Sequence, residues 1–351
     1  MNKLERIIAD QFNKENAYFT GNGTTALYLI FKSLDMKNKK VLFPNITCMT
    51  PVNAAIYAGY DVMFCDVSKD NFTMDVQKLI QIIEKGNIGI VVPTHLYGHI
   101  CDMQEIYEIC SERNILVIED CAQTSYISDY NDFAITSFGH TKLFENKRGG
   151  GAILYKDKSF KELFDKYSAK LSYENNEEEV KSYSAKYYRI TKSLTGDNYY
   201  SEMKKLQMTS KNIFLRHFKE NDELMELFKC KESIINKRNK RIDLYEKYLN
   251  KDKFIYPKTD KSYGSTLWRL SILTKDINRN RLVDLVRKNN VDISTWYPCL
   301  HRFYGTQSDS EFSNSIEIEN SIINLWVTEK YTEEKIKQDI EKINSIIRKE
   351  F

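Results

Sequence analysis

The sequence predicts an α/β protein with a large domain, built on a mostly parallel sheet flanked by helices, and a small C-terminal α/β domain. Two observations lead to this prediction. Short, continuous apolar runs alternate with amphipathic stretches through the first 155 residues, and strand and helix signals return after residue 266. Continuous apolar strands separated by helices are typical of parallel sheets covered on both faces. We therefore expect the large domain at residues 1–215, a long linking helix at 216–250 and the small domain at 251–351.

The individual elements of both domains follow from the apolar pattern. The helices of the large domain each have one apolar face, such as that of Ala26, Ile30 and Leu34. The last helix of the chain has a comparable stripe, formed by Ile336, Ile340, Ile343 and Ile347. Residues 160–250 are rich in Lys, Glu, Asn, Ser and Tyr, and within them residues 173–194 have no core pattern, which indicates a surface excursion. The predicted strands are 40–44, 61–67, 88–93, 115–120, 133–136 and 152–155 in the large domain, and 266–273 and 291–295 in the small one.

Composition excludes several classes of protein. The 52 basic and 49 acidic residues are mixed along the chain, a balance that argues against a nucleic-acid partner. Apolar runs are far shorter than the roughly 20 residues of a membrane helix, and the N-terminus lacks the pattern of a signal peptide. The seven cysteines are odd in number and form no C-x-x-C pair. We therefore expect reduced thiols, no metal site and a cytoplasmic location.

Polar residues follow two of the predicted buried strands and open one predicted helix, and parallel sheets bind ligands where their strands end. The strand 115–120 ends in Asp120, and the strand 133–136 leads to Ser137 and then Lys142. Near the N-terminus, "GNGTTAL" places Gly21, Gly23, Thr24 and Thr25 at the start of a helix, a common phosphate site. Taken alone, each has an ordinary explanation: a helix cap at Thr24, a turn at Asp120 and a surface lysine at Lys142.

Together these residues suggest one cofactor, pyridoxal 5'-phosphate. This group needs a lysine amine for its aldehyde, a carboxylate for its pyridinium nitrogen and a cradle for its phosphate. Lys142, Asp120 and the helix start at Thr24 supply these three functions in principle. Ser137 would add a hydroxyl to the phosphate site, and Gly149–Gly151 would let the backbone turn back into the sheet beside the cofactor.

Several motifs, in order along nearly the whole chain, resemble the DegT/DnrJ/EryC1/StrS sugar aminotransferases, which have the type I fold of pyridoxal-phosphate enzymes. The resemblance implies that Lys142 carries the cofactor and shuttles protons, and that Asp120 pairs with the pyridinium nitrogen. It also implies substrate contacts for His95, Tyr297 and His301, although ordinary packing explains each of them at least as well. The remaining cofactor contacts that it implies are Gly23, Thr24, Thr25, Cys48, Gln123 and Ser137. The motifs are "GNGTTAL", "VVPTHLYGHICDM", "VIEDCAQ", "SFGHTKLFENKRGGGAIL" and "VDISTWYPCLHRFYG".

The sequence departs from the family pattern at two places in the cofactor site. Cys48 occupies the position where the family usually stacks an aromatic ring on the cofactor, and a thiol offers less contact area. The "GYN-x-R" signature, whose asparagine reaches the cofactor phosphate of a partner subunit, is not recognisable between about 196 and 220. Asn198 and Asn212 are the candidates to replace that asparagine, and the sequence does not choose between them.

The resemblance implies an aminotransferase that moves an amino group, with glutamate as donor, to a nucleotide-linked keto-deoxysugar in surface-polysaccharide or amino-sugar biosynthesis. It also implies a homodimer with shared active sites. One alternative is a deoxysugar dehydratase of the same family, but there a histidine typically replaces the lysine found here at Lys142. The other is a cofactor-binding regulatory protein without turnover.

Overall fold

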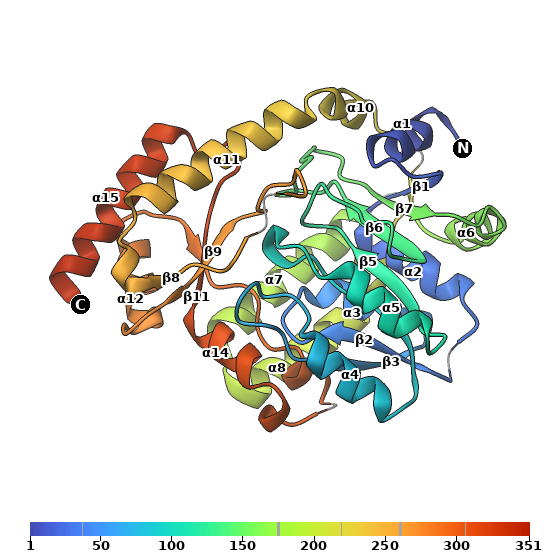
Figure 1. The fold of residues 1–351 in the computed structure, drawn as a ribbon, viewed down its shortest axis with the longest axis horizontal. Coiled ribbons are helices and arrows are strands. Elements are labelled where there is room, and N and C mark those ends of the chain that lie inside the picture. Colours follow the sequence, from blue (N-terminus) through green and yellow to red (C-terminus); the bar gives the residue numbers. More distant parts are fainter. Residues whose placement is uncertain (37, 174–175, 219, 260–261, 306) are drawn as a thin grey trace.

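The computed structural model describes residues 1–36, 38–173, 176–218, 220–259, 262–305 and 307–351. Two sheets organise these residues, one in each half of the molecule (Figure 1). The strands are β1 (Asn16–Thr20), β2 (Lys40–Pro44), β3 (Asp61–Cys65), β4 (Ile88–Val91), β5 (Leu116–Asp120), β6 (Phe133–Ser137), β7 (Gly151–Tyr155), β8 (Phe254–Ile255), β9 (Leu270–Thr274), β10 (Ile293–Ser294) and β11 (Ile322–Leu325). The helices are α1 (Lys3–Gln11), α2 (Gly23–Ser33), α3 (Met49–Ala58), α4 (Val76–Glu84), α5 (Met103–Ser111), α6 (Phe160–Ser168), α7 (Glu177–Ser193), α8 (Gly196–Thr209), α9 (Lys211–Phe214), α10 (Asp222–Lys229), α11 (Lys231–Tyr248), α12 (Arg279–Lys288), α13 (His301–Tyr304), α14 (Ser313–Ser321) and α15 (Glu333–Glu350).

The large sheet confirms the predicted mostly parallel architecture. Its strand order is β1-β7-β6-β5-β4-β2-β3, and every pair except the two made by β7 is parallel. The strand β1 was not predicted from the sequence, because "NAYFT" begins with a polar residue and has no long apolar run. It lies at the edge of the sheet and pairs with β7. Since the parallel strands point the same way, their carboxyl ends meet along one edge.

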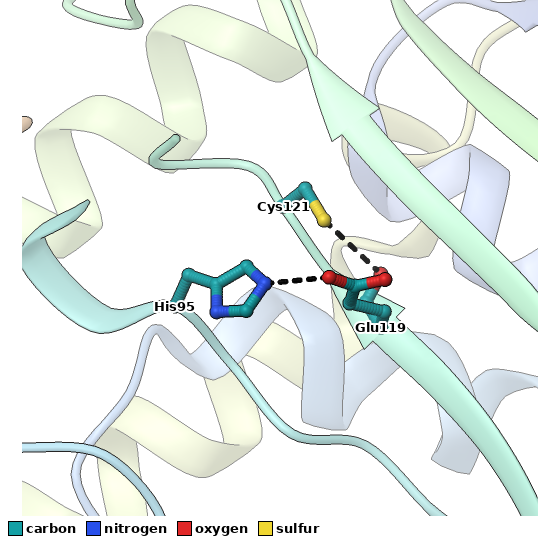
Figure 2. A group of neighbouring side chains, drawn as sticks. All are labelled: His95, Glu119 and Cys121. Carbon is teal, nitrogen blue, oxygen red and sulfur yellow. Dashed lines mark hydrogen bonds and ion pairs between the residues drawn. The ribbon is translucent and has the colours of Figure 1, made fainter. Parts of the chain in front are cut away.

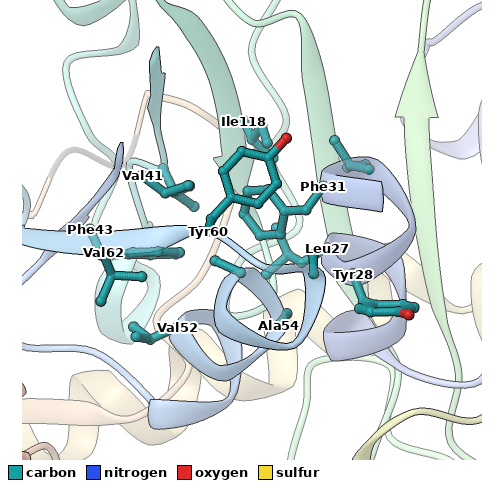
Figure 3. Close-up of a cluster of buried hydrophobic side chains, with 14 of the residues drawn as sticks. Leu27, Tyr28, Phe31, Val41, Phe43, Val52, Ala54, Tyr60, Val62 and Ile118 are labelled. Carbon is teal, nitrogen blue, oxygen red and sulfur yellow. The ribbon is translucent and has the colours of Figure 1, made fainter. Parts of the chain in front are cut away.

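Helices cover both faces of this sheet because its strands are apolar on both sides. In β2, Val41 and Phe43 face α2 and α3, whereas Leu42 between them faces the layer of α4 and α5. Figure 3 shows the first layer, in which Phe31 of α2 and Ala54 of α3 pack over the strands. Such continuous burial explains why the strands read as uninterrupted apolar runs.

The second sheet has the order β10-β11-β9-β8 and is antiparallel throughout. It packs against α11, α12 and α15, and the predicted isoleucine stripe of α15 is buried in this core. The predicted strands 266–273 and 291–295 are found shifted or shortened, as β9 and β10. The domain boundaries at residues 215 and 250 stay a prediction.

The expected single helix at 216–250 is wrong in one respect: it is two helices, α10 and α11, separated at Cys230. Cys230 leaves helical geometry, with φ −100° and ψ 9°. The two helices serve different cores, which explains the break. Leu224 and Phe228 of α10 pack with α1 and β1, whereas Ile242 and Tyr245 of α11 pack in the small domain (Figure 1).

The polar stretch 173–194 contains α7, which packs side by side with α8. Ile190 is the one fully buried residue of α7, in keeping with the expected surface position. All seven cysteines are free thiols, as predicted. Among the described helices, none combines the length and apolar character needed to cross a bilayer.

Candidate active site

The predicted site residues converge at the edge of the large sheet where the parallel strands end. Asp120 is the last residue of β5 and Ser137 the last of the neighbouring β6. Because β7 runs in the opposite direction, it starts at this same edge, and its first residue, Gly151, pairs with both Ser137 and Thr20. The chain leaves β1 here to enter α2. The parallel topology thus brings the helix start, the aspartate and the lysine loop together.

The first turn of α2 is built to receive an anion. Asn22 caps the helix by accepting a hydrogen bond from the Thr25 amide at 2.8 Å. The amides of Gly23 and Thr24 remain among the donors that helix geometry leaves open. A side chain at Gly23 would lie 3.3 Å from the Cβ of Ser137, so the serine stands directly beside this turn. These positions agree with a phosphate cradle.

The glycine run 149–151 is explained by close contacts with this turn. A Cβ atom at Gly151 would lie 2.4 Å from the carbonyl carbon of Asn22 and 2.5 Å from the amide nitrogen of Gly23. Gly150 has φ +131°, a conformation that residues with side chains rarely adopt. Only glycines let β7 start this close to α2.

Thr25 has a different role from the predicted one. Its hydroxyl donates to the Arg216 carbonyl at 2.9 Å and accepts from the Arg216 amide at 3.1 Å. The single hydroxyl proton is therefore used inside the protein, and Thr25 fixes the backbone of Arg216 beside the helix start. Arg216 was not identified from the sequence, although it lies inside the stretch 196–220 that was expected to complete the cradle. Asn198 and Asn212, the two candidates in that stretch, are exposed.

Lys142 lies in the turn after β6, where its amide donates to the Gly139 carbonyl at 3.1 Å. Its Nζ lies 5.7 Å from the centroid of the Trp268 ring, and Trp268 in turn donates from Nε1 to the Thr141 carbonyl at 2.7 Å. Burial lowers the pKa of Lys142, while the nearby Cys48 and Asp120 act in the opposite direction. The lysine is thus held in an aromatic setting that favours its neutral amine.

Asp120 is buried, and its Oδ1 accepts from the Ala122 amide at 3.0 Å. Burial raises the pKa of this carboxyl, and the Ala122 amide and the positive charge of Lys142 partly offset that effect. A cation placed against the carboxylate would favour its ionised form further. Asp120 therefore suits a cationic partner such as a protonated ring nitrogen.

Residues on either side of Asp120 hold the end of β5 in place (Figure 2). The Glu119 carboxylate accepts from His95 Nε2 at 2.7 Å, from the Ser128 amide at 3.0 Å and from Asn131 Nδ2 at 2.6 Å. His95 Nδ1 accepts from the Cys101 amide at 3.0 Å, so the ring is a neutral tautomer that donates to Glu119. Although His95, Glu119 and Cys121 lie within 4.8 Å of one another, the carboxylate and imidazole are already engaged. His95 therefore supports the strand end and does not face a ligand.

A layer of aromatic rings closes over this edge. Tyr97, Trp268 and Tyr297 stack with interplanar angles of 12–14°. Gln123 is clamped within the layer, since it accepts from the Tyr97 amide at 2.7 Å and donates to the Tyr297 hydroxyl at 3.2 Å. Arg269 lies against the Trp268 ring, with its guanidinium carbon 3.9 Å from the ring centroid. Tyr97 and Trp268 were missed because no spacing in the sequence links them to Tyr297.

Cys48 and Tyr297 line a cavity of about 670 Å³ beside this layer. Its wall includes Tyr183 and Tyr187 of α7 and Tyr199 of α8, together with Trp296 and Arg279. Lys142 lines a second cavity of about 720 Å³, next to α11. His301 lies away from both cavities, with its ring nitrogens on Asn45 and Asp309 at 3.0 and 2.7 Å. The structure therefore brings Tyr297 to the site and leaves His301 in the packing.

The chemical groups at this sheet edge match the three functional groups of pyridoxal phosphate: its ring nitrogen, its aldehyde and its phosphate. A buried carboxylate, a lysine in a desolvated setting and a helix start with open amides lie along one sheet edge. In addition, Arg216 Nε is buried with no hydrogen-bond partner among the described residues, as a site for an anion requires. Lys142 would hold the aldehyde, Asp120 the ring nitrogen, and Gly23, Thr24 and Ser137 the phosphate.

Comparison with known proteins supports this description. A profile of the DegT/DnrJ/EryC1/StrS aminotransferase family matches residues 1–344. GDP-perosamine synthase of Escherichia coli O157:H7 is 33% identical over 159 residues, which cover 43% of this chain and 43% of that protein. The matches to this and two further GDP-perosamine synthases span less than half of those proteins' lengths.

Other similarities extend over nearly the whole chain. The dTDP-3-amino-3,6-dideoxy-alpha-D-galactopyranose transaminase of Aneurinibacillus thermoaerophilus is 23% identical over 354 residues, covering 95% of this chain and 89% of that protein. The crystal structure of a DegT DnrJ EryC1 StrS aminotransferase from Brucella abortus superimposes with a TM-score of 0.75 at 18% identity, covering 98% of this chain and 89% of that one. The fold is therefore the type I fold of pyridoxal-phosphate enzymes, and the cofactor predicted from the sequence is that of the family. With a family match over residues 1–344, the chain belongs to the DegT/DnrJ/EryC1/StrS aminotransferase family.

Proposed function

We propose that this protein is an aminotransferase that moves an amino group from glutamate to the ketone of a nucleotide-linked deoxysugar. One observation carries the proposal: Asp120 ends β5 and Lys142 lies in the turn after the adjacent parallel strand β6, at the same sheet edge as the open first turn of α2. The names of the similar proteins, GDP-perosamine synthase and a dTDP-sugar transaminase, support a nucleotide-sugar acceptor. We further propose a homodimer that works in the cytoplasm in amino-sugar or surface-polysaccharide biosynthesis.

Bound pyridoxal phosphate would supply an electron-accepting ring and an aldehyde that carries the amino group between the two substrates. Asp120 would keep the ring nitrogen protonated by presenting a buried negative charge. Lys142 would take the proton from the donor's α-carbon and deliver it to the carbon of the cofactor's aldehyde group, for which its amine must be neutral. Burial lowers the pKa of Lys142 in the required direction. Its presence also argues against the dehydratase alternative, in which a histidine typically takes this place.

The cavity of about 670 Å³ is our candidate for the acceptor site. It borders Tyr297 of the aromatic layer, and its tyrosines offer flat surfaces for a sugar or a base. Arg279 at its wall adds a positive charge suited to the diphosphate of a nucleotide sugar.

The test follows the two halves of the reaction separately. Purified protein loaded with cofactor is mixed with glutamate, and we expect 2-oxoglutarate to form in one equivalent per site with a shift of the cofactor absorbance. GDP-, dTDP- and UDP-linked keto-deoxysugars are then added, and mass spectrometry should detect an amino sugar from at least one of them. Absence of 2-oxoglutarate would favour the regulatory alternative. Loss of a sugar hydroxyl without gain of nitrogen would favour the dehydratase. Sedimentation at micromolar concentration tests the dimer independently, and a monomer would contradict it.

A further inference from the structure

We propose that Arg216 binds the cofactor phosphate from within the same chain, and so takes the place of the partner-subunit asparagine expected from the family pattern. The proposal rests on the use of pyridoxal phosphate by this protein and not on the identity of the amino donor or acceptor. Four features of the described residues support it: the anchoring of the Arg216 backbone, the course of its side chain, its burial and its lack of an acidic partner.

The backbone of Arg216 is fixed to the helix start that forms the cradle. Thr25 lies in the first turn of α2, and its hydroxyl bonds both the carbonyl and the amide of Arg216, at 2.9 and 3.1 Å. The Asn22 side chain, which caps the same turn, also donates to the Phe214 carbonyl at 2.9 Å. Residues 214–216 are thus held against α2 although they lie about 190 positions further along the chain.

The side chain of Arg216 runs across Gly21 toward Gly149. A Cβ atom at Gly21 would lie 2.9 Å from Arg216 Cγ and 2.3 Å from the Arg216 carbonyl oxygen, so only glycine leaves room for it. A Cβ atom at Gly149 would lie 3.5 Å from Arg216 Nη2 and 3.9 Å from the Cα of Gly139. A Cβ atom at Gly139 would in turn lie 3.9 Å from the Ser137 hydroxyl oxygen. The guanidinium therefore ends beside Gly149, and Gly139 lies next to both Gly149 and the predicted phosphate-binding Ser137.

The charge of Arg216 is not balanced by a neighbouring acid. Among the described residues, no carboxylate forms an ion pair with it, and its Nε is buried without a hydrogen-bond partner. Burial lowers the pKa of Arg216, because a guanidinium removed from water without a counter-ion is less stable in its charged form. The nearby Arg148 differs, since it is exposed and stacks on Phe218 with its guanidinium carbon 4.8 Å from the ring centroid. A half-buried, unpaired guanidinium beside the start of a helix is well placed to bind an anion. Arginine binds phosphate through two parallel hydrogen bonds.

The test compares two ligands that differ only in the phosphate. Apo protein is titrated with pyridoxal 5'-phosphate and with pyridoxal, and the dissociation constants are measured from the absorbance change. We expect Arg216→Met to weaken binding of the phosphorylated ligand by roughly 10- to 100-fold, the range for loss of a charge-assisted contact, and to leave pyridoxal binding within about twofold. Arg216→Lys should fall between, since it keeps the charge but not the fork. Arg113→Met, on the surface after α5, is the matched control and should change neither constant.

Equal weakening of both ligands would overturn the proposal, because it would indicate a structural role, and so would no change in either. Neither outcome depends on glutamate or a sugar nucleotide, so failure here is distinct from failure of the proposed aminotransfer. If the Arg216 variants do not fold, a measurement on the unaltered protein still tests the proposal. Phenylglyoxal labelling of apo protein, mapped by mass spectrometry, should modify Arg216, and millimolar inorganic phosphate should protect it. Labelling of Arg216 that phosphate does not reduce would contradict the proposal.

Discussion

Replacing Glu119 by Gln should destabilise the protein strongly, because this buried side chain is surrounded by donors. Its Oε1 accepts from His95 Nε2 and the Ser128 amide, and its Oε2 accepts from the Ser128 hydroxyl and Asn131 Nδ2. Burial alone would raise the pKa of Glu119, but hydrogen bonds from His95 and Ser128 outweigh it and lower the pKa. The native side chain is therefore an ionised carboxylate that uses both oxygens as acceptors.

A glutamine amide offers one oxygen and one NH₂ group, so one side of the site would place donor against donor. His95 cannot relieve the clash by changing tautomer, since its Nδ1 accepts from Cys101. Asn131 cannot relieve it by rotating its amide, because Nδ2 also donates to the Ser128 carbonyl at 2.7 Å. One buried donor left unsatisfied and the loss of charge-assisted bonds together should cost about 3 kcal/mol. For a chain of this length that corresponds to a fall of about 4 °C in Tm.

Urea unfolding followed by circular dichroism at pH 7 measures the change, with Tm as a second readout. The control is Glu112→Gln, because Glu112 is exposed near the end of α5 and pairs with Arg113 at the surface; this variant should match the unaltered protein within error. A loss below about 1 kcal/mol in Glu119→Gln would refute the reasoning, because a protonated, neutral Glu119 would tolerate an amide of the same shape.

Three further predictions concern the cofactor site and pH dependence. Lys142→Ala should abolish the borohydride-stable attachment of the cofactor, whereas Lys147→Ala, an exposed lysine of the same loop, should retain it; recovery of labelled cofactor on Lys147 would show that the lysine is misassigned. Asp120→Asn should slow the half reaction with glutamate by at least about a hundredfold while cofactor binding weakens only modestly, and near-normal turnover in single-turnover assays would contradict the role of the carboxylate. Burial lowers the pKa of His99 to about 4, below its unfolded value near 6.5, so its contribution to stability is complete above pH 6.5 and is lost as pH falls toward 4. The loss amounts to about 3 kcal/mol, and His99→Gln should remove that part of the pH dependence in urea titrations at pH 4–7; an unchanged slope would argue that His99 is already protonated in the folded protein.

The sequence alone determined the class of fold and the central residues of the candidate site. Buried parallel strands must be apolar on both faces, so their approximate limits could be predicted from the apolar runs of the sequence. A polar residue at the end of such a run is therefore easy to identify. Asp120, Ser137 and Lys142 were identifiable for this reason. The predicted meeting of these residues follows from topology, because parallel strands end at one edge of a sheet.

The tertiary structure decided which neighbours each of these residues has. Arg216 reaches Gly21 and Gly149 only through the packing of segments distant in sequence, and the same packing directs the Thr25 hydroxyl away from the cradle. The break at Cys230 was hidden because α10 and α11 have a continuous helical composition, while their apolar faces belong to two different cores. Local patterns encode which face of an element is buried. They do not encode what it is buried against, and that contact determines whether a polar side chain serves the fold or the site.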